Sequence, residues 1–314
     1  MDQTQPLNAR AVLLILLTVV LWAATPVAIR YSTDLLRPMT VSGLRFLLAG
    51  IFMLGWVRVH KTSLRLRAGQ WKLPCIGGIL LFFQIGTFTA GVDLSNASHG
   101  SIFVNTFIFW IVAIEHFVTR VHRITPLRFT GLFLAAFGVT LILFPDSDQP
   151  VDLLERASLE GDLLLLLSAF ILAVKLTYTK YAVRNLHPDS FIFWHGVFGT
   201  SLMLGWAFLF EDFRPGVLMQ FEDLRTQHAV WSLLYQGFAV AGLCFAIQAR
   251  LLEKHSASSV AVFSFATPLF GILFAVLFRG DPLSPWLFVS GIAVATGILL
   301  VNLRLTPQPL THRR

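Results

Sequence analysis

The stretch AVLLILLTVVLWAATPVAI, residues 11–29, runs for 19 residues without a charged side chain. At about 1.5 Å per residue, a helix of this length spans the ~30 Å hydrocarbon core of a bilayer. Arg10 before the stretch and the small residues at its end resemble a secretory signal. The apolar run is too long for a signal peptide, and the second half of the chain has a counterpart. We therefore predict a membrane-spanning helix here.

The whole chain has the composition of a membrane protein. Of its 314 residues, 55% are apolar and 13% are charged, and the mean hydropathy is +0.71. Soluble domains carry about 25% charged residues, so a water-soluble core would not hide this much apolar surface. In lipid, backbone polar groups must be bonded within the segment, which favours helices over open strands. The sequence predicts an all-α polytopic protein whose partner is the lipid bilayer.

Charged residues and prolines divide the apolar blocks into ten predicted transmembrane helices. They are Ala11–Tyr31, Pro38–Val57, Leu73–Gly91, Ala97–Thr119, Pro126–Phe144, Gly161–Tyr181, Pro188–Phe210, Ala229–Leu252, Ala257–Phe278 and Leu283–Leu303. With the N-terminus in the cytoplasm, 16 of the 24 Lys and Arg residues fall on that side, 6 fall outside and 2 lie within spans. We expect a protein of the cytoplasmic (inner) membrane of a bacterium, with both termini cytoplasmic.

The two halves of the chain repeat one pattern. Similar residues stand 150 positions apart at Arg30 and Lys180, Pro38 and Pro188, Arg45 and His195, and Gly55-Trp56 and Gly205-Trp206. Farther along the offset is 160, and the matching residues are Gly77 and Gly237, Ala97 and Ala257, and Gly131 and Gly291. The change of offset fits a longer loop in the second half, near Glu211 to Arg225. Such agreement predicts an internal duplication.

Each copy contains five spans, so the second copy enters the membrane from the opposite side. The predicted repeats are residues 11–144 and 161–303, joined by an extracytoplasmic linker at 145–160. Inverted repeats around a site near the bilayer midplane are the design of many secondary transporters. When the two halves exchange conformations, an outward-open state becomes an inward-open one. The symmetry therefore predicts alternating access.

Five short stretches carry a resemblance to a known family. They are LWAATPVAIR (residues 21–30), SGLRFLLAG (42–50), ASHGS (97–101), ASSVA (257–261) and TPLF (267–270). They resemble the first helix, the arginine-bearing second helix, the starts of the fourth and ninth helices, and the proline signature of EamA-type proteins in the drug/metabolite transporter (DMT) superfamily. The resemblance extends from about Ala11 to Leu303. It implies ten helices in two inverted five-helix EamA repeats.

Three positions bear on how closely the two repeats follow the family pattern. The first repeat has Ile108 where the second has the signature proline, Pro268. The acidic residue usual before the fifth and tenth helices is Asp281 in the second repeat and is replaced by His122 in the first. The resemblance is specific for the family and does not specify a substrate.

Ionisable residues inside predicted spans are the first candidates for a solute path, because each costs about 2.5 to 3.5 kcal/mol on insertion scales unless it has a partner or water. Arg45 and His195 each lie seven residues after the proline that begins their span. One interpretation makes them charged gates on opposite sides of one path. In the other, Arg45 snorkels or fixes helix packing, and His195 is a satisfied core histidine.

The fourth and sixth spans place further charges toward the cytoplasmic side. Lys175 shares a partly polar helical stripe with Tyr178, and Asn105 and His116 share one face of the fourth span with Glu115 at its flank. We predict that Glu115 pairs with Lys175 or with His195, since opposite charges in a low dielectric favour each other. Glu115 or His116 would then carry a coupling proton. The alternative is separate snorkelling at the lipid interface.

Aromatic residues are the other candidates for contact with a solute. Trp22 and Trp110 belong to a set of large rings that would grip an apolar or aromatic solute, although most aromatic residues of a membrane protein face lipid. Trp22 is preferred because the resemblance places it on the central first helix. Pro268 is included because it carries the proline signature.

Several classes of function are excluded or disfavoured. The sequence contains no GxxxxGK[ST], HExxH or GxSxG motif, and Cys75 and Cys244 lack metal-site spacing, so we expect no cofactor and no ATP hydrolysis. The net charge of +7 fits basic cytoplasmic loops rather than nucleic-acid binding. The sequence favours a secondary exporter of small organic solutes. An antiporter of anionic metabolites, a non-transporting sensor and an intramembrane enzyme are the alternatives, and pairing into a homodimer stays open.

Overall fold

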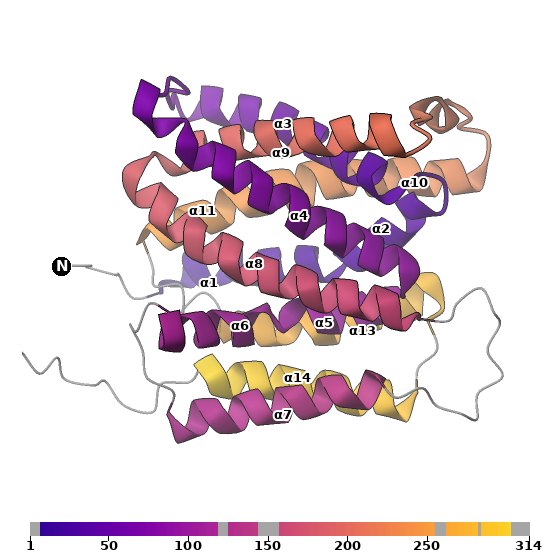
Figure 1. Cartoon of the computed structure of the whole chain (residues 1–314). Helices are drawn as coiled ribbons and strands as arrows, with labels where there is room; N and C mark the ends of the chain where they lie inside the picture. The colour runs from indigo at the N-terminus through magenta and orange to yellow at the C-terminus, as the bar shows by residue number, and fades with distance from the viewer. Residues whose placement is uncertain (1–6, 119–124, 144–156, 255–261, 282–283, 303–314) are drawn as a thin grey trace, which may run out of the picture.

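The apolar blocks form helices in the computed structural model, which describes residues 7–118, 125–143, 157–254, 262–281 and 284–302 (Figure 1). Each of the ten predicted spans contains helix, and the described residues include no β-strand. Six helical runs are long and apolar enough to cross a bilayer, and three shorter apolar helices accompany them. The chain is therefore an all-α polytopic membrane protein, as predicted.

The described residues of the first half form seven α-helices and two short irregular helices. They are α1 (Ala9–Ala23), α2 (Thr25–Thr33), α3 (Pro38–Val59), η1 (Ala68–Gln70), α4 (Lys72–Leu94), α5 (Ala97–Asn105), α6 (Phe107–Ala113), η2 (Ile114–Val118) and α7 (Pro126–Leu143). The second half contains α8 (Leu159–Asn185), α9 (Pro188–Phe210), η3 (Pro215–Met219), α10 (Leu224–Leu234), η4 (Tyr235–Cys244), α11 (Phe245–Lys254), η5 (Val262–Phe265), α13 (Ala266–Arg279) and α14 (Pro285–Asn302).

The first span is broken, where the sequence predicted one continuous helix. Pro26 has no backbone N–H and its ring disfavours continuous helix, so α1 ends at Ala23 and α2 begins at Thr25. The break leaves carbonyl groups without a partner in the helix, and the Leu21 carbonyl accepts a hydrogen bond from the Tyr235 hydroxyl. Irregular backbone at membrane depth requires such partners within the protein.

The fourth and eighth spans are also irregular. The fourth breaks at Thr106, whose hydroxyl donates to the Phe103 carbonyl at 2.7 Å, even though Ile108 replaces the proline found in the second repeat. Hydroxyl bonds of this kind bend helices. In the eighth span, η4 is a ten-residue π-helix, a conformation that is rare and is often found at functional sites.

The two halves run through the bundle in opposite directions. In Figure 1, α1 starts at the left and α2 continues to the right, whereas α8 starts at the right and ends at the left. We call the side where α1 begins the α1 end and the side where α2 finishes the α2 end. The inverted two-repeat architecture predicted from the odd number of spans is thus present.

Glycines make symmetric contacts between the halves. A Cβ on Gly77 of α4 would lie 3.2 Å from the Cβ of His195 on α9. Gly237 of η4 is equivalent to Gly77, and its Cβ would lie 3.0 Å from the carbonyl oxygen of Arg45 on α3. Each half therefore places its third-span glycine against the charged second helix of the other half. Small residues allow such close approach of helices in membranes.

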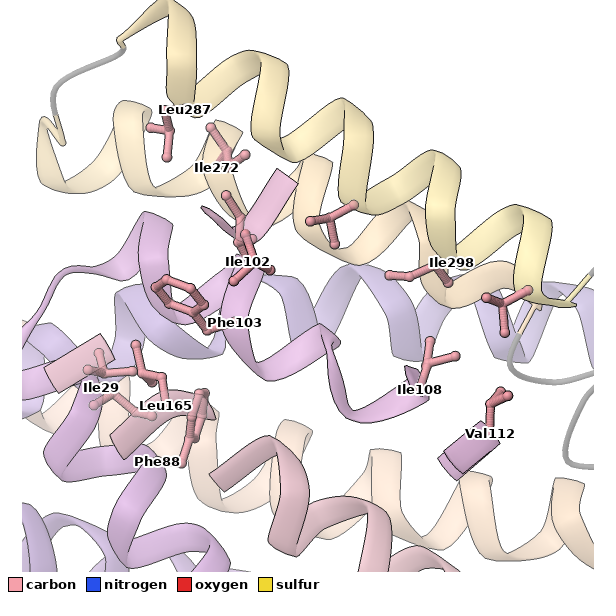
Figure 2. Close-up of a cluster of buried hydrophobic side chains, with 14 residues drawn as sticks. Ile29, Phe88, Ile102, Phe103, Ile108, Val112, Leu165, Ile272, Leu287 and Ile298 are labelled. Carbon is pink, nitrogen blue, oxygen red and sulfur yellow. The ribbon is translucent and has the colours of Figure 1, made fainter. Parts of the chain in front are cut away.

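The largest apolar cluster joins both repeats (Figure 2). It brings together Phe103 of α5, Leu165 of α8, Ile272 of α13 and Ile298 of α14. The α7 and α14 helices pack against each other along one flank of the bundle in Figure 1. The polar centre described next is surrounded by the broken first span, by α3, α4, α8 and α9, and by the irregular eighth span.

Candidate functional site

Three side chains that carry or can carry positive charge are buried in the middle of the bundle. Arg45 of α3 is 2% exposed, Lys175 of α8 is 4% exposed and His195 of α9 is 3% exposed. All three were predicted from the sequence because they are ionisable groups inside apolar spans. The structure adds their contacts.

Arg45 has few hydrogen-bond partners for a buried guanidinium. Its Nη1 atom lies 3.5 Å from Oε1 of Gln236, and its Nε atom has no hydrogen-bond partner. Gln236 is itself held in place, because its Nε2 atom donates to the Ala28 carbonyl at 3.0 Å and to the Ser32 hydroxyl at 2.9 Å. The amide therefore presents its oxygen to Arg45. A neutral amide oxygen 3.5 Å away compensates a buried positive charge only weakly.

Lys175 is bonded in a similar way on the other side of the site. Its Nζ atom donates to Oε1 of Gln84 at 2.7 Å, and Gln84 Nε2 donates to the Ser168 hydroxyl at 3.3 Å. The Ser168 hydroxyl in turn donates to the Gln84 carbonyl at 2.9 Å, which fixes the position of the glutamine. Because α8 continues to Asn185, Lys175 lies ten residues from the end of its helix, deeper than the sequence suggested.

Aromatic rings lie between the two cations. The Arg45 guanidinium is 5.2 Å from the centre of the Phe46 ring, and the Lys175 ammonium is 5.3 Å from the centre of the Phe245 ring. The two rings pack edge to face with centres 6.0 Å apart, and the ring of Trp22 lies 6.4 Å from that of Phe245 in the same geometry. The ring of Trp22 therefore lies beside the aromatic pair that contacts the two cations.

His195 is oriented by its own helix. Its Nδ1 atom lies 2.7 Å from the Ile192 carbonyl, and its ring stacks on Phe191 with centres 5.1 Å apart. A carbonyl oxygen accepts only, so Nδ1 carries the proton and Nε2 of the neutral ring is left as an acceptor. His195, Phe46 and Phe245 line a cavity of about 10 Å³, room for about one water molecule.

The buried carboxylates of the described residues are occupied elsewhere. Asp162 accepts from the Ser95 hydroxyl at 2.6 Å and lies 2.9 Å from Nδ1 of His99. Asp281 accepts from the backbone N–H of Ser98, and Asp189 accepts from Thr62 and Arg250. Within the described side chains, no ion pair or hydrogen bond joins a carboxylate to Arg45, Lys175 or His195. Among the described side chains, the cationic groups of the centre therefore have no carboxylate partner.

The predicted pairing of Glu115 remains a prediction. Glu115 lies in η2, but its side chain falls outside the described part of the structure. Its predicted partners already have contacts, Lys175 with Gln84 and His195 with backbone carbonyls. His116 packs against the ring of Phe117 with centres 4.7 Å apart.

The remaining candidates are spread over the bundle. Asn105 is buried and donates to the Ser101 carbonyl at 2.6 Å, Tyr178 donates to the Leu73 carbonyl at 3.1 Å, and Pro268 is buried in α13. Trp110 is 39% exposed and packs on Phe170 at the outer surface, so we do not include it in the central site.

Sequence reasoning missed Gln84 and Gln236. Both are buried, at 3% and 0% exposed, and each holds one of the two cations. A search for ionisable residues passes over neutral amides. The available signal was a glutamine inside an apolar span, since a polar side chain in lipid requires a partner just as a charged one does. No cluster of three or more metal-ligating side chains occurs among the described residues.

Contacts between the halves close the centre at both ends. At the α2 end, Nη1 of Arg279 donates to Asp34 at 2.7 Å, and the Tyr31 hydroxyl donates to the Phe278 carbonyl. At the α1 end, the Thr62 hydroxyl donates to Asp189 at 3.1 Å, and Tyr178 donates to Leu73. Polar contacts between the halves therefore cover the centre at both ends of the bundle.

Comparison with known proteins gives a consistent result. The chain is 21% identical to the "Uncharacterized transporter YoaV" of Bacillus subtilis (strain 168), over 89% of this chain and 92% of that protein. It is 25% identical to the "Probable amino-acid metabolite efflux pump" of Escherichia coli (strain K12), over 91% and 93%. Among solved structures, a crystal structure with similar fold gives a TM-score of 0.68 at 18% identity, over 94% of this chain and 96% of that chain.

The family itself is established by two matches along the chain. Residues 9–144 and residues 159–303 each match the EamA-like transporter family. These ranges coincide with the two inverted halves of the fold, and together they cover most of the sequence. The chain therefore belongs to the EamA-like transporter family, within the DMT superfamily.

Proposed function

We propose that this chain is a secondary carrier that exports small organic solutes by alternating access between its two halves. The observation that carries the proposal is the enclosed polar centre, which lies between inverted repeats and is bridged by polar contacts at both ends. A buried group of cations with no described carboxylate partner costs stability, and a solute-binding role accounts for keeping it. The driving energy comes from a gradient or from exchange, since the sequence has no nucleotide-binding loop.

The direction of transport and the substrate class form the finer part of the proposal. Export is supported by relatives that are named as probable amino-acid metabolite efflux pumps. Metabolites, amino acids and drugs are the solutes we expect. A second candidate is an antiporter that exchanges anionic metabolites such as sugar phosphates, which the positive charge of Arg45 and Lys175 favours. The family match gives no support to the enzyme and sensor alternatives.

Counterflow into liposomes tests this function. Purified protein is reconstituted in vesicles that contain one unlabelled solute, and uptake of the same labelled solute is measured for amino acids, amines and sugar phosphates. We expect saturable accumulation of at least one class above protein-free vesicles. A pH-sensitive dye inside the vesicles reports whether protons move together with the solute. If Glu115 or His116 carries the coupling proton, Glu115→Gln should remove this dye signal. Absence of counterflow for every solute would count against the carrier.

The orientation is also part of the proposal. We place both termini and the Arg58–Lys72 loop in the cytoplasm, and residues 145–160 outside as the linker between the repeats at 11–144 and 161–303. Reporter fusions at His60 and Asn185 should give the same cytoplasmic signal, and a fusion at Gln220 should give the opposite one. Opposite signals at His60 and Asn185 would contradict the inverted arrangement in the membrane.

A further inference from the structure

We propose that Arg45 binds the carboxylate group of the transported solute, so that the substrate is an organic acid or amino acid with an apolar body. Lys175 supplies a second positive charge, and Gln84 and Gln236 support the two cations. We call these four residues the anion site. This inference rests on the proposed carrier function, and it specifies the chemistry that the carrier recognises.

The buried Nε–H donor of Arg45 has no hydrogen-bond acceptor. A guanidinium offers five N–H donors in a planar fork that matches a carboxylate. Arg45 is 2% exposed, its Nε atom has no partner and its Nη1 atom reaches only the Gln236 amide oxygen at 3.5 Å. Buried charges in proteins are normally paired. The missing partner is an anion with oxygen acceptors, which is the description of a substrate carboxylate.

Lys175 and the two glutamines extend the same pattern. The Lys175 ammonium has three donors and contacts Gln84 Oε1 at 2.7 Å. Both cations are thus met by neutral amide oxygens, and both glutamines are anchored by their Nε2 atoms, at Ser168 and at Ala28 with Ser32. A charged acceptor forms hydrogen bonds roughly twice as strong as a neutral one. A substrate carboxylate would therefore displace the Gln236 oxygen from Arg45.

The surroundings of Arg45 indicate the rest of the solute. The rings of Phe46, Phe245 and Trp22 pack edge to face beside the two cations. Such rings bury an apolar or aromatic group of a ligand. The neighbouring cavity has room for about one water molecule, so a solute requires the two halves to separate. Two stretches of irregular backbone lie beside Arg45. Gln236 belongs to the π-helix η4, and Ala28 follows the break in the first span.

A purely structural role for Arg45 predicts a different outcome. If Arg45 served to hold η4 to α3 through Gln236, its loss would lower the melting temperature. If it awaits an anion, removing an unpaired buried charge should leave the melting temperature unchanged or raise it while transport falls. Stability and transport therefore separate the two roles.

The test uses four solutes of one shape, 3-phenylpropanoate, phenylalanine, phenylalaninamide and phenethylamine. The first two carry a carboxylate and the last two lack it. Counterflow of each is measured with the wild-type protein and with Arg45→Gln, Arg45→Lys and Lys175→Gln. The matched control is Arg214→Gln, because Arg214 is exposed in the loop after α9. Melting temperatures of the purified variants are measured in detergent, with and without 3-phenylpropanoate.

We expect the wild-type protein to exchange the two carboxylates and to be stabilised by 3-phenylpropanoate. Arg45→Gln should reduce carboxylate exchange about 10- to 100-fold at an unchanged or higher melting temperature, and should abolish the ligand-induced shift. Arg45→Lys should retain part of the activity because it keeps the charge without the fork. Lys175→Gln should cause a smaller loss, and Arg214→Gln should behave as wild type.

A loss of exchange by Arg45→Gln that comes with a lower melting temperature would assign Arg45 a structural role and contradict the inference. Two further results would overturn it. One is exchange of the amine or the amide, or of other uncharged or cationic solutes, without exchange of either carboxylate. The other is undiminished carboxylate exchange by Arg45→Gln. Both leave the carrier function intact. A wild-type protein that exchanges nothing in this set or in the wider panel would instead contradict the proposed function, and the anion site with it.

Discussion

Transport should stop when the double variant Asp34→Cys, Arg279→Cys is bridged by a short bifunctional methanethiosulfonate reagent, and it should resume when a thiol reductant is added. Asp34 follows α2 in the first half, and Arg279 is the last residue of α13 in the second half. Their side chains form an ion pair at 2.7 Å, and the guanidinium also lies 4.8 Å from the centre of the Tyr31 ring. A covalent bridge there would hold the α2 end closed. Alternating access requires that end to open once per cycle, so the loss should be nearly complete.

The cross-link needs a background without native thiols, so Cys75 and Cys244 are first replaced by alanine. The matched control is the double variant Asp212→Cys, Arg214→Cys. Asp212 and Arg214 form an ion pair at 2.8 Å, but both belong to the loop after α9, so a bridge between them joins no two parts of the fold. The control should transport normally after the same treatment. Unchanged transport by the bridged Asp34 and Arg279 variant would mean that this end does not open.

The fold was predictable because lipid leaves few alternatives. An uncharged run such as residues 11–29 must form a helix, and an odd number of helices in a duplicated unit requires an inverted second copy. The break at Ala24 had a visible cause in Pro26. The break at Thr106 involves a local bond from its hydroxyl to the Phe103 carbonyl, but a threonine in an apolar span does not by itself predict a break. The π-helix from Tyr235 to Cys244 had no marker in the sequence.

From the sequence, residues of the site were predictable only where a charged side chain is energetically costly to place in lipid. Arg45, Lys175 and His195 stood out because a charge inside a span is expensive. Gln84 and Gln236 lacked that signal, and only the structure places them on the cations. Trp110 was predicted as a candidate for the site but is 39% exposed, because the residue type does not say which face of a helix meets lipid. Helix orientation comes from packing between spans, which a single sequence does not contain.

Gly297→Ala should destabilise the protein, whereas Gly55→Ala should leave it unchanged or more stable. A Cβ on Gly297 of α14 would lie 2.6 Å from the carbonyl oxygen of Gly131 and 2.7 Å from the Cβ of Ala135, both on α7. The oxygen belongs to the backbone and cannot rotate away, so α7 must shift. Overpacking of this kind costs about 1–3 kcal/mol. Gly55 lies inside α3 with nothing within 4 Å of its Cβ position, so alanine there gains about 1 kcal/mol of helix propensity.

The opposite signs expected for the two changes in stability distinguish close packing from a general effect of adding a methyl group to a membrane helix. It can be measured from the melting temperatures of the two purified variants in one detergent, followed by tryptophan fluorescence. The α7 and α14 pair lies on the flank of the bundle, away from Arg45, so Gly297→Ala protein that stays folded should keep the wild-type preference among solutes. Equal melting temperatures for the two variants would contradict the tight contact between α7 and α14. Small residues at this contact let the two backbones approach where no hydrophobic effect drives helices together, so their loss has no compensating gain.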